Sequence, residues 1–447
     1  MQKERIMRIA AFCLAVLMLL FAIPAIEASA LEAPTVSRVG AAYLYNIENK
    51  KVIFEQDADK QMYPAASVKI MTAVVAYEAL SSRLNETIVI TKDMIAGAKG
   101  NHIAIEAGEH IIVRDLFYAM LLKGANDAAF VLANLSCGSI DDFVAKMNER
   151  ARSLGMENTL YRNPTGMHDP EMLTTARDTA QAAEAFASHE ELVEMSSVSK
   201  HVIEQTAHCA ARNIYNRNAF VTKLNSLGAT EYYYKYSRGM SFGSTEEGGD
   251  SFVTMAQKDG LRNICVILGG EEDGDGDVIH AFVAARALCE YAVEGFGYIK
   301  VLTPDRLVYD MPVSLSEETD RVMLIPDGEI KAFLPYDTNI ETDLTYSYAL
   351  EHESLTAPVP EGQQVGYISV YLGEELLGST ALVTQNEVKL SKFLSLLESI
   401  KIFTRSKFFI CSAISLAVVS LAFVFGNSIY RGQRARRRNS IRNKKFR

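Results

Sequence analysis

The order of apolar and polar positions along the chain predicts strands at both ends of a long first region, with helices between them. Alternating or short apolar runs bounded by turn residues indicate strands, whereas apolar residues three and four apart indicate helices. The predicted elements are strands at 41–46, 52–54, 251–256 and 263–268 and helices at 68–81, 114–135, 140–154 and 278–293. This order favours an α+β domain with one sheet built from N-terminal and C-terminal segments.

The pattern changes between residues 296 and 386. Short apolar runs broken by Pro and Gly, at 307–309, 322–325 and 365–371, predict a small all-β domain. Residues 387–407 then place apolar side chains on one face, with lysines among the other positions. This segment is an amphipathic helix that either lies on a membrane or packs as a stalk on the β domain.

Both ends of the chain carry long apolar runs. Basic residues, a short apolar core and Ala28-Ser29-Ala30 predict a signal peptide over 1–30, with an uncleaved anchor as the alternative. At the other end, residues 408–430 form a predicted transmembrane helix, because Phe408–Ile429 has no charged residue. The tail 431–447 holds nine Lys or Arg and no acid, which is typical of a cytoplasmic flank.

The charge and the cysteine content limit the classes of partner that we expect for residues 31–430. The whole chain carries −10; the leader carries +1 and the tail +9, so residues 31–430 carry −20. Such a surface does not favour nucleic acid. The cysteines outside the leader and the span are widely spaced and lack CxxC or histidine partners, and therefore indicate isolated thiols: Cys137, Cys209, Cys265 and Cys289. No metal and no cofactor is expected.

Histidines and acidic residues give no metal site either. His102, His110 and His168 have no ligand spacing. The acidic run 271–277 lacks the EF-hand spacing and its closing glutamate, which favours a solvated loop over a calcium site.

A series of short strings carries a family resemblance. In chain order these are 69–73 (KIMTA), 108–109 (GE), 115–116 (DL), 126–129 (NDAA), Phe143 with 147–148 (MN), 154–159 (LGMENT), 163–166 (NPTG) and 175–178 (TARD). In this order they resemble the D-alanyl-D-alanine carboxypeptidases, the low-molecular-weight penicillin-binding proteins. The stretch 355–363 (LTAPVPEGQ) is similar to the β-rich module that follows the catalytic domain in that family.

The resemblance implies a fold and a set of domains. Residues 31–295 would form the penicillin-binding transpeptidase-like domain, a central antiparallel sheet with helices, and 296–386 the small all-β domain. Segments 387–407, 408–430 and 431–447 would be the amphipathic stalk, the transmembrane helix and the basic cytoplasmic tail. The ectodomain would then lie outside the membrane.

The first of the family's three catalytic motifs is incomplete. In Ser-x-x-Lys the serine attacks and the lysine accepts its proton from one helical turn away. This chain keeps Lys69, but Ala66 stands at the nucleophile position. Ser67 is a low-ranking substitute, since two residues on a helix subtend about 200° and Ser67 would point away from Lys69. Without its serine, Lys69 is expected to remain as a structural cation that bonds Asn126.

The other two motifs are also altered. At Ser-x-Asn the chain has Gly124-Ala125-Asn126, so the relay hydroxyl is lost and the substrate-holding amide stays. An ungapped register places the Lys-Thr-Gly motif of the edge strand at Ser241-Phe242-Gly243, where only the glycine remains. A rival register uses Lys235-Tyr236-Ser237 and needs six inserted residues.

These losses lead to one function and two alternatives. The sequence predicts a membrane-anchored, catalytically inactive member of the family, which binds peptidoglycan stem peptides or a cell-wall protein. The first alternative is an active serine-type carboxypeptidase that trims pentapeptides through Ser67 and Lys69. The second, a β-lactamase-like hydrolase, is disfavoured by the same missing serine and by the trailing β domain.

Overall fold

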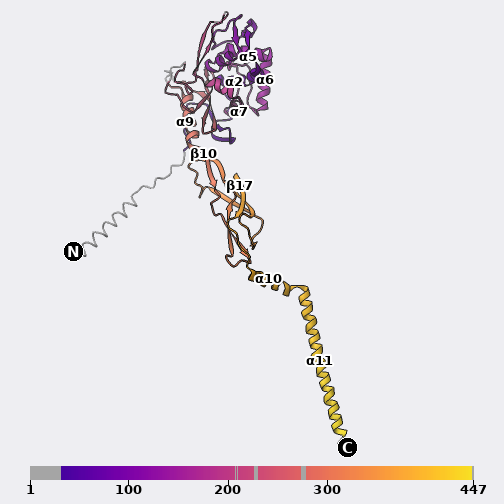
Figure 1. The fold of residues 1–447 in the computed structure, drawn as a ribbon. Helices are drawn as coiled ribbons and strands as arrows, with labels where there is room; N and C mark the ends of the chain where they lie inside the picture. Colours follow the sequence, from indigo (N-terminus) through magenta and orange to yellow (C-terminus); the bar gives the residue numbers. More distant parts are fainter. Residues whose placement is uncertain (1–31, 207, 209, 226–229, 273–277, 445–447) are drawn as a thin grey trace, which may run out of the picture. The chain divides into compact units, whose positions relative to one another are not determined.

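The computed structural model describes residues 32–206, 208, 210–225, 230–272 and 278–444. The predicted leader 1–30, Cys209 and most of the acidic run 271–277 therefore lie outside the described residues. The chain divides into two compact units, Met1–Tyr298 with Phe333–Thr338, and Ile299–Ala332 with Asn339–Arg447. Each unit is described by itself (Figure 1).

One antiparallel sheet is the frame of the first unit. Its strands are β1 (Ala41–Asn46), β2 (Lys51–Gln56), β7 (Ser237–Thr245), β8 (Gly249–Lys258) and β9 (Leu261–Gly270). Their order is β2-β1-β9-β8-β7, and β1 pairs with β9 so that Ala41 faces Leu268. The predicted sheet of N-terminal and C-terminal segments is thus confirmed, and β7 is its edge strand.

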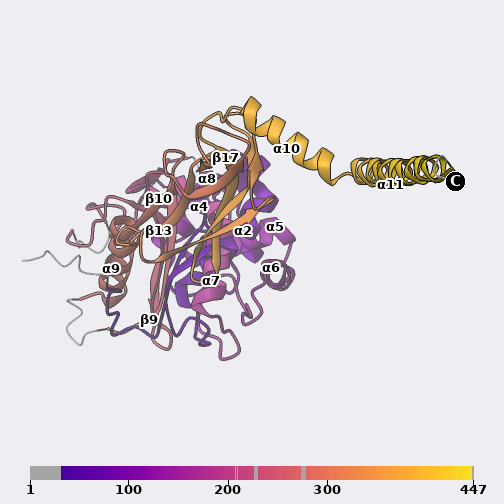
Figure 2. The same ribbon diagram turned by 90° about the horizontal axis from the view of Figure 1, so that it is seen from below.

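Helices cover both faces of this sheet. Side chains alternate along β1, so that Tyr43 belongs to the apolar cluster under α2 (Val68–Leu80) and α7 (Ala176–Ala187), whereas Leu44 belongs to the cluster under α9 (His280–Gly295). Figure 2 shows α9 and α7 on opposite sides of β9. The sheet is therefore buried on both faces.

The remaining elements of the first unit include two long helices, α5 and α6, and several short elements. They are β3 (Thr87–Val89), α3 (Lys92–Ile95), β4 (His110–Ile112), α4 (Val113–Tyr118), α5 (Asn126–Cys137), α6 (Ile140–Ser153), α8 (Glu190–Ser197), β5 (Lys200–Ile203) and β6 (Arg212–Tyr215). One-turn helices lie at η1 (Ala65–Ser67), η2 (Ser81–Arg83) and η3 (Ala119–Lys123).

The prediction of a single helix over 114–135 is wrong. Helix α4 continues into the π-helical turn η3, and this helical stretch ends at Gly124, which has φ +72°. A new helix, α5, begins at Asn126. Apolar periodicity continues through the break, so periodicity alone could not show it; the left-handed glycine ends the first helix.

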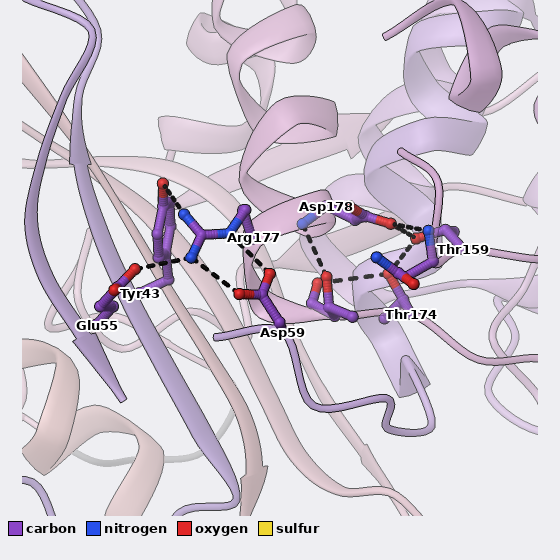
Figure 3. A network of polar contacts seen from close by, with 9 residues as sticks. Tyr43, Glu55, Asp59, Thr159, Thr174, Arg177 and Asp178 are labelled. Atoms are coloured by element: carbon purple, nitrogen blue, oxygen red, sulfur yellow. Dashed lines mark hydrogen bonds and ion pairs between the residues drawn. The ribbon is translucent and has the colours of Figure 1, made fainter. Parts of the chain in front are cut away.

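An ion-pair network ties α7 to the first two strands (Figure 3). Arg177 donates from Nε to Asp59 Oδ1 at 2.7 Å and from Nη2 to Glu55 Oε2 at 2.8 Å. Its Nη1 donates to the Tyr43 hydroxyl at 3.3 Å. Because the guanidinium joins β1, β2 and the first turn of α7, this network orients the helix on the sheet.

The neighbouring Asp178 holds a loop in the same view (Figure 3). Its Oδ2 accepts from Thr159 Oγ1 at 2.7 Å and from the Asn158 backbone N–H at 2.9 Å. Thr159 and Thr174 also share a hydrogen bond of 2.8 Å. Two of the strings that carry the family resemblance, 154–159 and 175–178, are therefore brought together as one structural cluster.

The second unit is built around a six-stranded sheet of order β14-β16-β17-β12-β11-β15. The strands are β11 (Tyr309–Ser314), β12 (Arg321–Pro326), β14 (Leu344–Leu350), β15 (Leu355–Thr356), β16 (Gln364–Leu372) and β17 (Glu375–Thr384). Two further strands, β10 (Phe296–Leu302) and β13 (Ile330–Pro335), pair with each other, and each has residues in both units. The predicted all-β domain is confirmed, and the apolar run 307–309 leads into β11, which begins at Tyr309.

Two helices end the chain. The predicted amphipathic segment forms α10 (Lys392–Arg405), which starts where the Ser391 side chain caps the Leu394 N–H. It begins five residues later than predicted for 387–407, because residues 387–391 continue as irregular chain. The following α11 (Lys407–Lys444) contains Lys407–Arg436, which is the one single helix among the described residues that is long and apolar enough to cross a membrane.

Candidate functional site

A small cavity lies where α2, α5 and β7 meet. Its volume is about 90 Å³. Its walls include residues from all three altered motifs: Ala66 and Lys69, Gly124 and Asn126, and Phe242 and Gly243. Asn101, Thr165, Gly166, Met167, Arg217, Ser244 and Thr245 complete the lining.

The turn before α2 places a methyl group at the cavity wall. Ala65 has φ +44°, and the one-turn helix η1 carries Ala66 toward the cavity. Ser67 is 4% exposed, is not among the lining residues, and donates from its hydroxyl to Pro64 O at 2.7 Å. The hydroxyl of Ser67 is thus engaged by its own turn, while the residue at the cavity has none.

Lys69 is a buried amine without an acidic partner in the cavity. Its Nζ donates to the Thr165 carbonyl at 2.6 Å. Burial, and then the positive charge of Arg217, lower the pKa of Lys69 to about 7. The expectation that Lys69 bonds Asn126 is wrong, because the 163–166 loop supplies the acceptor instead.

Asn126 stands at the first turn of α5 with one polar atom unpaired. Its backbone N–H donates to Asn101 O at 2.7 Å, and its Nδ2 donates to Lys99 O at 2.7 Å. The residue is only 4% exposed, and its Oδ1 is buried and has no hydrogen-bond partner among the described residues. An unpaired buried acceptor is costly, so this oxygen is suited to a donor from a ligand.

Gly124 lies just before Asn126, in the left-handed region at φ +72°. A Cβ at this position would lie 3.3 Å from Asn101 Nδ2. The position of the family's relay serine is therefore occupied by a backbone conformation that disfavours any side chain.

The edge strand β7 brings the third motif position to the same cavity. Ser241 Oγ donates to Ala66 O at 2.9 Å, and a Cβ on Gly243 would lie 2.9 Å from the Ala66 methyl. Between them, Phe242 packs its ring on Phe282 of α9, with a centroid distance of 4.5 Å. The lysine and threonine positions of the motif are thus taken by Ser241 and Phe242, and the threonine of this strand that lines the cavity is Thr245, two residues beyond Gly243.

The rival motif position lies elsewhere. Lys235 is exposed and holds its ammonium 4.7 Å from the centre of the Tyr236 ring. Lys235, Tyr236 and Ser237 are not among the residues that line the cavity.

Arg217 was not predicted from the sequence. It lies in the chain between β6 and β7, lines the cavity, and has its guanidinium 5.8 Å from the centre of the Phe242 ring. Burial lowers the pKa of Arg217, and the nearby Asp250 opposes this shift. The sequence signal is its position between two asparagines, Asn216 and Asn218, whose side chains donate to backbone carbonyls of Ser196, Val198 and Gly239.

The structure also shows how the possible metal ligands and the cysteines are arranged. Within the described part of the chain, no group of three or more His, Cys, Asp or Glu side chains is arranged to hold a metal ion. Cys137, Cys265 and Cys289 are free thiols.

A sheet covered by helices, with a cavity where its edge strand β7 meets the start of α2, is the arrangement expected for the penicillin-binding class of fold. The sequence matches the family described as D-alanyl-D-alanine carboxypeptidase over residues 28–272. It also matches the penicillin-binding protein 5 C-terminal domain over residues 296–390. The chain therefore belongs to the D-alanyl-D-alanine carboxypeptidase family of peptidoglycan metabolism, and the second unit is the module that follows the catalytic domain.

Individual relatives agree with this assignment. The chain is 27% identical to the D-alanyl-D-alanine carboxypeptidase DacC of Escherichia coli over 376 residues, which covers 80% of this chain and 86% of that protein. It is 21% identical to DacF of Bacillus subtilis over 361 residues, or 80% and 88% of the two chains. Among solved structures, penicillin-binding protein 5 of Haemophilus influenzae matches with a TM-score of 0.56 and 21% identity, covering 80% of this chain and 99% of that one.

Proposed function

We propose that this protein is a membrane-anchored, extracytoplasmic member of the family that binds peptidoglycan stem peptides without cleaving them. The observation that carries the proposal is the methyl group of Ala66 at the cavity wall, one helical turn before Lys69. Without a hydroxyl at this position, no acyl-enzyme forms there.

The expected loss of turnover supports the proposal that the protein is inactive. Catalytic groups that act as a unit are not additive, and loss of the nucleophile alone costs about a millionfold in turnover. Here Ala66, Gly124 and Ser241 replace the nucleophile, the relay hydroxyl and the motif lysine together. Ser67 offers no substitute in this geometry, because its hydroxyl bonds Pro64 and lies outside the cavity lining.

The retained groups support binding. The unpaired Oδ1 of Asn126 accepts a hydrogen bond from a peptide N–H, and the edge strand β7 offers backbone groups for an extended peptide. The 163–166 loop closes the opposite wall through Thr165 and Gly166. These groups suit a peptide end that lies between β7 and α5.

The two ends of the chain support a location of the protein at the membrane, with residues 31–407 outside the cell. In this proposal the leader directs the body outside the cell, α11 spans the membrane, and the basic tail stays in the cytoplasm. The apolar side chains of α10 are exposed, among them Phe393 at 62% and Ile400 at 50%. We therefore place α10 at the lipid surface rather than packed on the β domain.

Retention on purified sacculi tests the binding claim. The full chain in detergent is expected to co-sediment with sacculi, and Asn126→Ala is expected to reduce that retention about tenfold because it removes the cavity's amide. Asn134→Ala is the matched control, since Asn134 lies on the same helix and bonds Met94 O away from the cavity. Retention unchanged by Asn126→Ala would move the binding surface to another part of the protein and favour a wall-protein partner.

A further inference from the structure

The six-stranded sheet of the second unit has one covered face and one exposed face. On the covered side, a Cβ built on Gly378 would lie 2.8 Å from Ile330 of β13. On the same side the Tyr346 hydroxyl donates to Val301 O of β10 at 3.3 Å. Val370 stands between Gly378 and Tyr346 in the strand register and is fully buried. Because side chains alternate along a strand, the residues next to this row lie on the opposite face.

The exposed side of this sheet, which we call the outer face, includes nine residues from β14, β16 and β17. The strand pairing places them in three rows, and each row takes one residue from each strand. All nine are exposed or half-buried, with Tyr367 at 51% and Leu376 at 54%. A row of three serines lies between two rows that each hold a tyrosine. The rows are Thr345, Tyr371 and Leu376; Ser347, Ser369 and Ser379; and Ala349, Tyr367 and Ala381.

The outer face is neutral and rich in hydroxyl groups. None of its nine residues is charged near neutral pH, whereas residues 31–430 together carry −20. Ser369 Oγ and Ser379 Oγ share a hydrogen bond of 2.7 Å, and each hydroxyl can still bond a further donor or acceptor. Each tyrosine adds an apolar ring that ends in a hydroxyl. Such a face suits a neutral ligand that has both apolar surfaces and many hydroxyl groups, and sugar rings have both.

A chain of sugars fits the outer face better than a protein partner does. Tyr367 and Tyr371 are four residues apart on β16, or about 13 Å along the strand, so one saccharide chain can cross both rings. The core of a protein interface is apolar and poor in serine, whereas here the serine row lies at the centre of the face. The nine residues also lack the charged side chains that would bind an acidic or a basic partner.

We propose that the outer face binds the glycan strand of peptidoglycan, with sugar rings on Tyr367 and Tyr371 and their hydroxyl and acetamido groups bonded to the serine row. The chain belongs to a family of peptidoglycan metabolism, and the glycan of that polymer is a strand of β-1,4-linked N-acetylated amino sugars. This inference goes beyond the proposed function, because it concerns the second unit and the sugar part of the polymer. It rests on the family membership and not on the inactivity of the cavity.

A sugar ligand without peptide tests the inference. The probe is a β-1,4-linked oligomer of N-acetylglucosamine, titrated calorimetrically into the full chain in a detergent that has no sugar headgroup. The wild type is expected to bind the oligomer. Tyr367→Ala and Tyr371→Ala are each expected to weaken this binding about tenfold, because each removes a ring on which a sugar stacks.

Controls separate this role from a structural one. Tyr309→Ala removes a tyrosine that is 38% exposed and whose ring contacts Tyr348, away from the outer face, and is expected to leave the binding unchanged. The unfolding temperature of each variant reports whether it is folded. A pull-down of the wild type on glycan strands freed of their stem peptides needs no variant and tests the sugar ligand alone, whereas intact sacculi offer both ligands.

Each contrary result has a distinct meaning. Failure of the wild type to bind both the oligomer and the peptide-free strands would overturn this inference and leave the proposed stem-peptide binding standing. Binding that Tyr367→Ala and Tyr371→Ala both retain in full would also overturn it, since the sugars would then lie on another surface. Displacement of the oligomer by a free stem peptide would place the sugars at the cavity, with the same consequence. A dimer that dissociates in Tyr367→Ala, without sugar binding, would assign the outer face to a second copy of the chain instead.

Discussion

At the scale of single residues, a few substitutions decide the chemistry of the cavity. Ala66 contributes a methyl group where a nucleophile would stand, and Gly124 contributes only backbone. Lys69 and Asn126 are kept, but their hydrogen bonds go to Thr165 and Lys99 and not to each other. The cavity therefore keeps an amine and an amide of the motifs, and has no hydroxyl at positions 66 and 124.

Restoring one hydroxyl should not restore catalysis. Ala66→Ser is expected to release no D-alanine above background from a D-Ala-D-Ala tripeptide, because Gly124, Ser241 and Phe242 still lack the relay and the motif cation. Gly124→Ser would add strain at φ +72°, of about 1–2 kcal/mol. Amino-acid release measured by chromatography checks this. Sustained turnover by the single variant would mean that the third motif has been assigned to the wrong residues.

The buried amine should leave a pH signature in stability. The pKa of Lys69 is about 7 in the folded protein, against about 10.5 for an ordinary lysine. Between these values the unfolded chain holds a proton that the native state does not, so stability rises with pH across this window. Lys69→Met removes the effect. The difference in unfolding free energy, wild type minus variant, is expected to grow by up to about 1.4 kcal/mol per pH unit above pH 7.

Urea unfolding of both proteins at pH 6, 7, 8 and 9 measures that difference. Lys223→Met, which removes an exposed lysine, is the control with which the Lys69→Met difference is compared. A flat profile for Lys69→Met would show that the amine stays charged in the folded protein.

The residues of the cavity could be identified from the sequence only where they belong to one of the three motifs. The spacing of Ala66 and Lys69, and of Gly124 and Asn126, identified four residues that the cavity brings together. Arg217 could not be found this way, because its position depends on a fold that carries a distant loop to the cavity. The partner of Lys69 could not be predicted either, since the carbonyl of Thr165 is 96 residues away in the chain.

At the scale of elements, glycines place the segments that form the cavity. Gly166 has φ +82°, and a Cβ there would lie 1.9 Å from Ala65 O, in direct collision with the turn before α2. The 163–166 loop therefore reaches the turn only because this residue has no side chain. The same reasoning explains the break at Gly124, which apolar periodicity over 114–135 concealed.

Gly166→Ala should be more damaging than an equivalent change elsewhere. The left-handed backbone alone costs about 1–2 kcal/mol, and the collision with Ala65 adds to it. Gly155→Ala is the matched control, since Gly155 has φ +77° and nothing within 4 Å of a Cβ. Thermal unfolding is expected to show a larger loss for Gly166→Ala, together with loss of peptide binding. Equal losses in the two variants would show that the loop can move away from the turn.

At the scale of the whole molecule, the chain joins a carboxypeptidase-family unit, a β module and a helix that is long and apolar enough to cross a membrane. The sharing of one sheet by N-terminal and C-terminal segments was predictable, because strands occur at both ends of the first region with helices between them, but the pairing of β1 with β9 was not. The order of the six strands in the second unit was not predictable either, because short apolar runs give no pairing partners.

The proposed topology predicts which side of the membrane each end occupies. A C-terminal tag is expected to resist protease in intact spheroplasts and to be removed in inverted vesicles. The region before α10 is expected to be digested in intact spheroplasts and protected in inverted vesicles. The nine basic residues after the span provide the physical reason. A tag that is cleaved in intact spheroplasts would place the tail outside and contradict the proposed anchor.

The most direct test of the central claim is covalent labelling with a fluorescent penicillin. The full chain in detergent, shown to be folded by circular dichroism, is incubated at saturating label beside an active carboxypeptidase of the family. Gel fluorescence and intact mass are expected to show no adduct, because Ala66 offers no hydroxyl to acylate. A stoichiometric adduct that maps to Ser67 would show an acylating enzyme with a rearranged turn before α2, and would contradict the account.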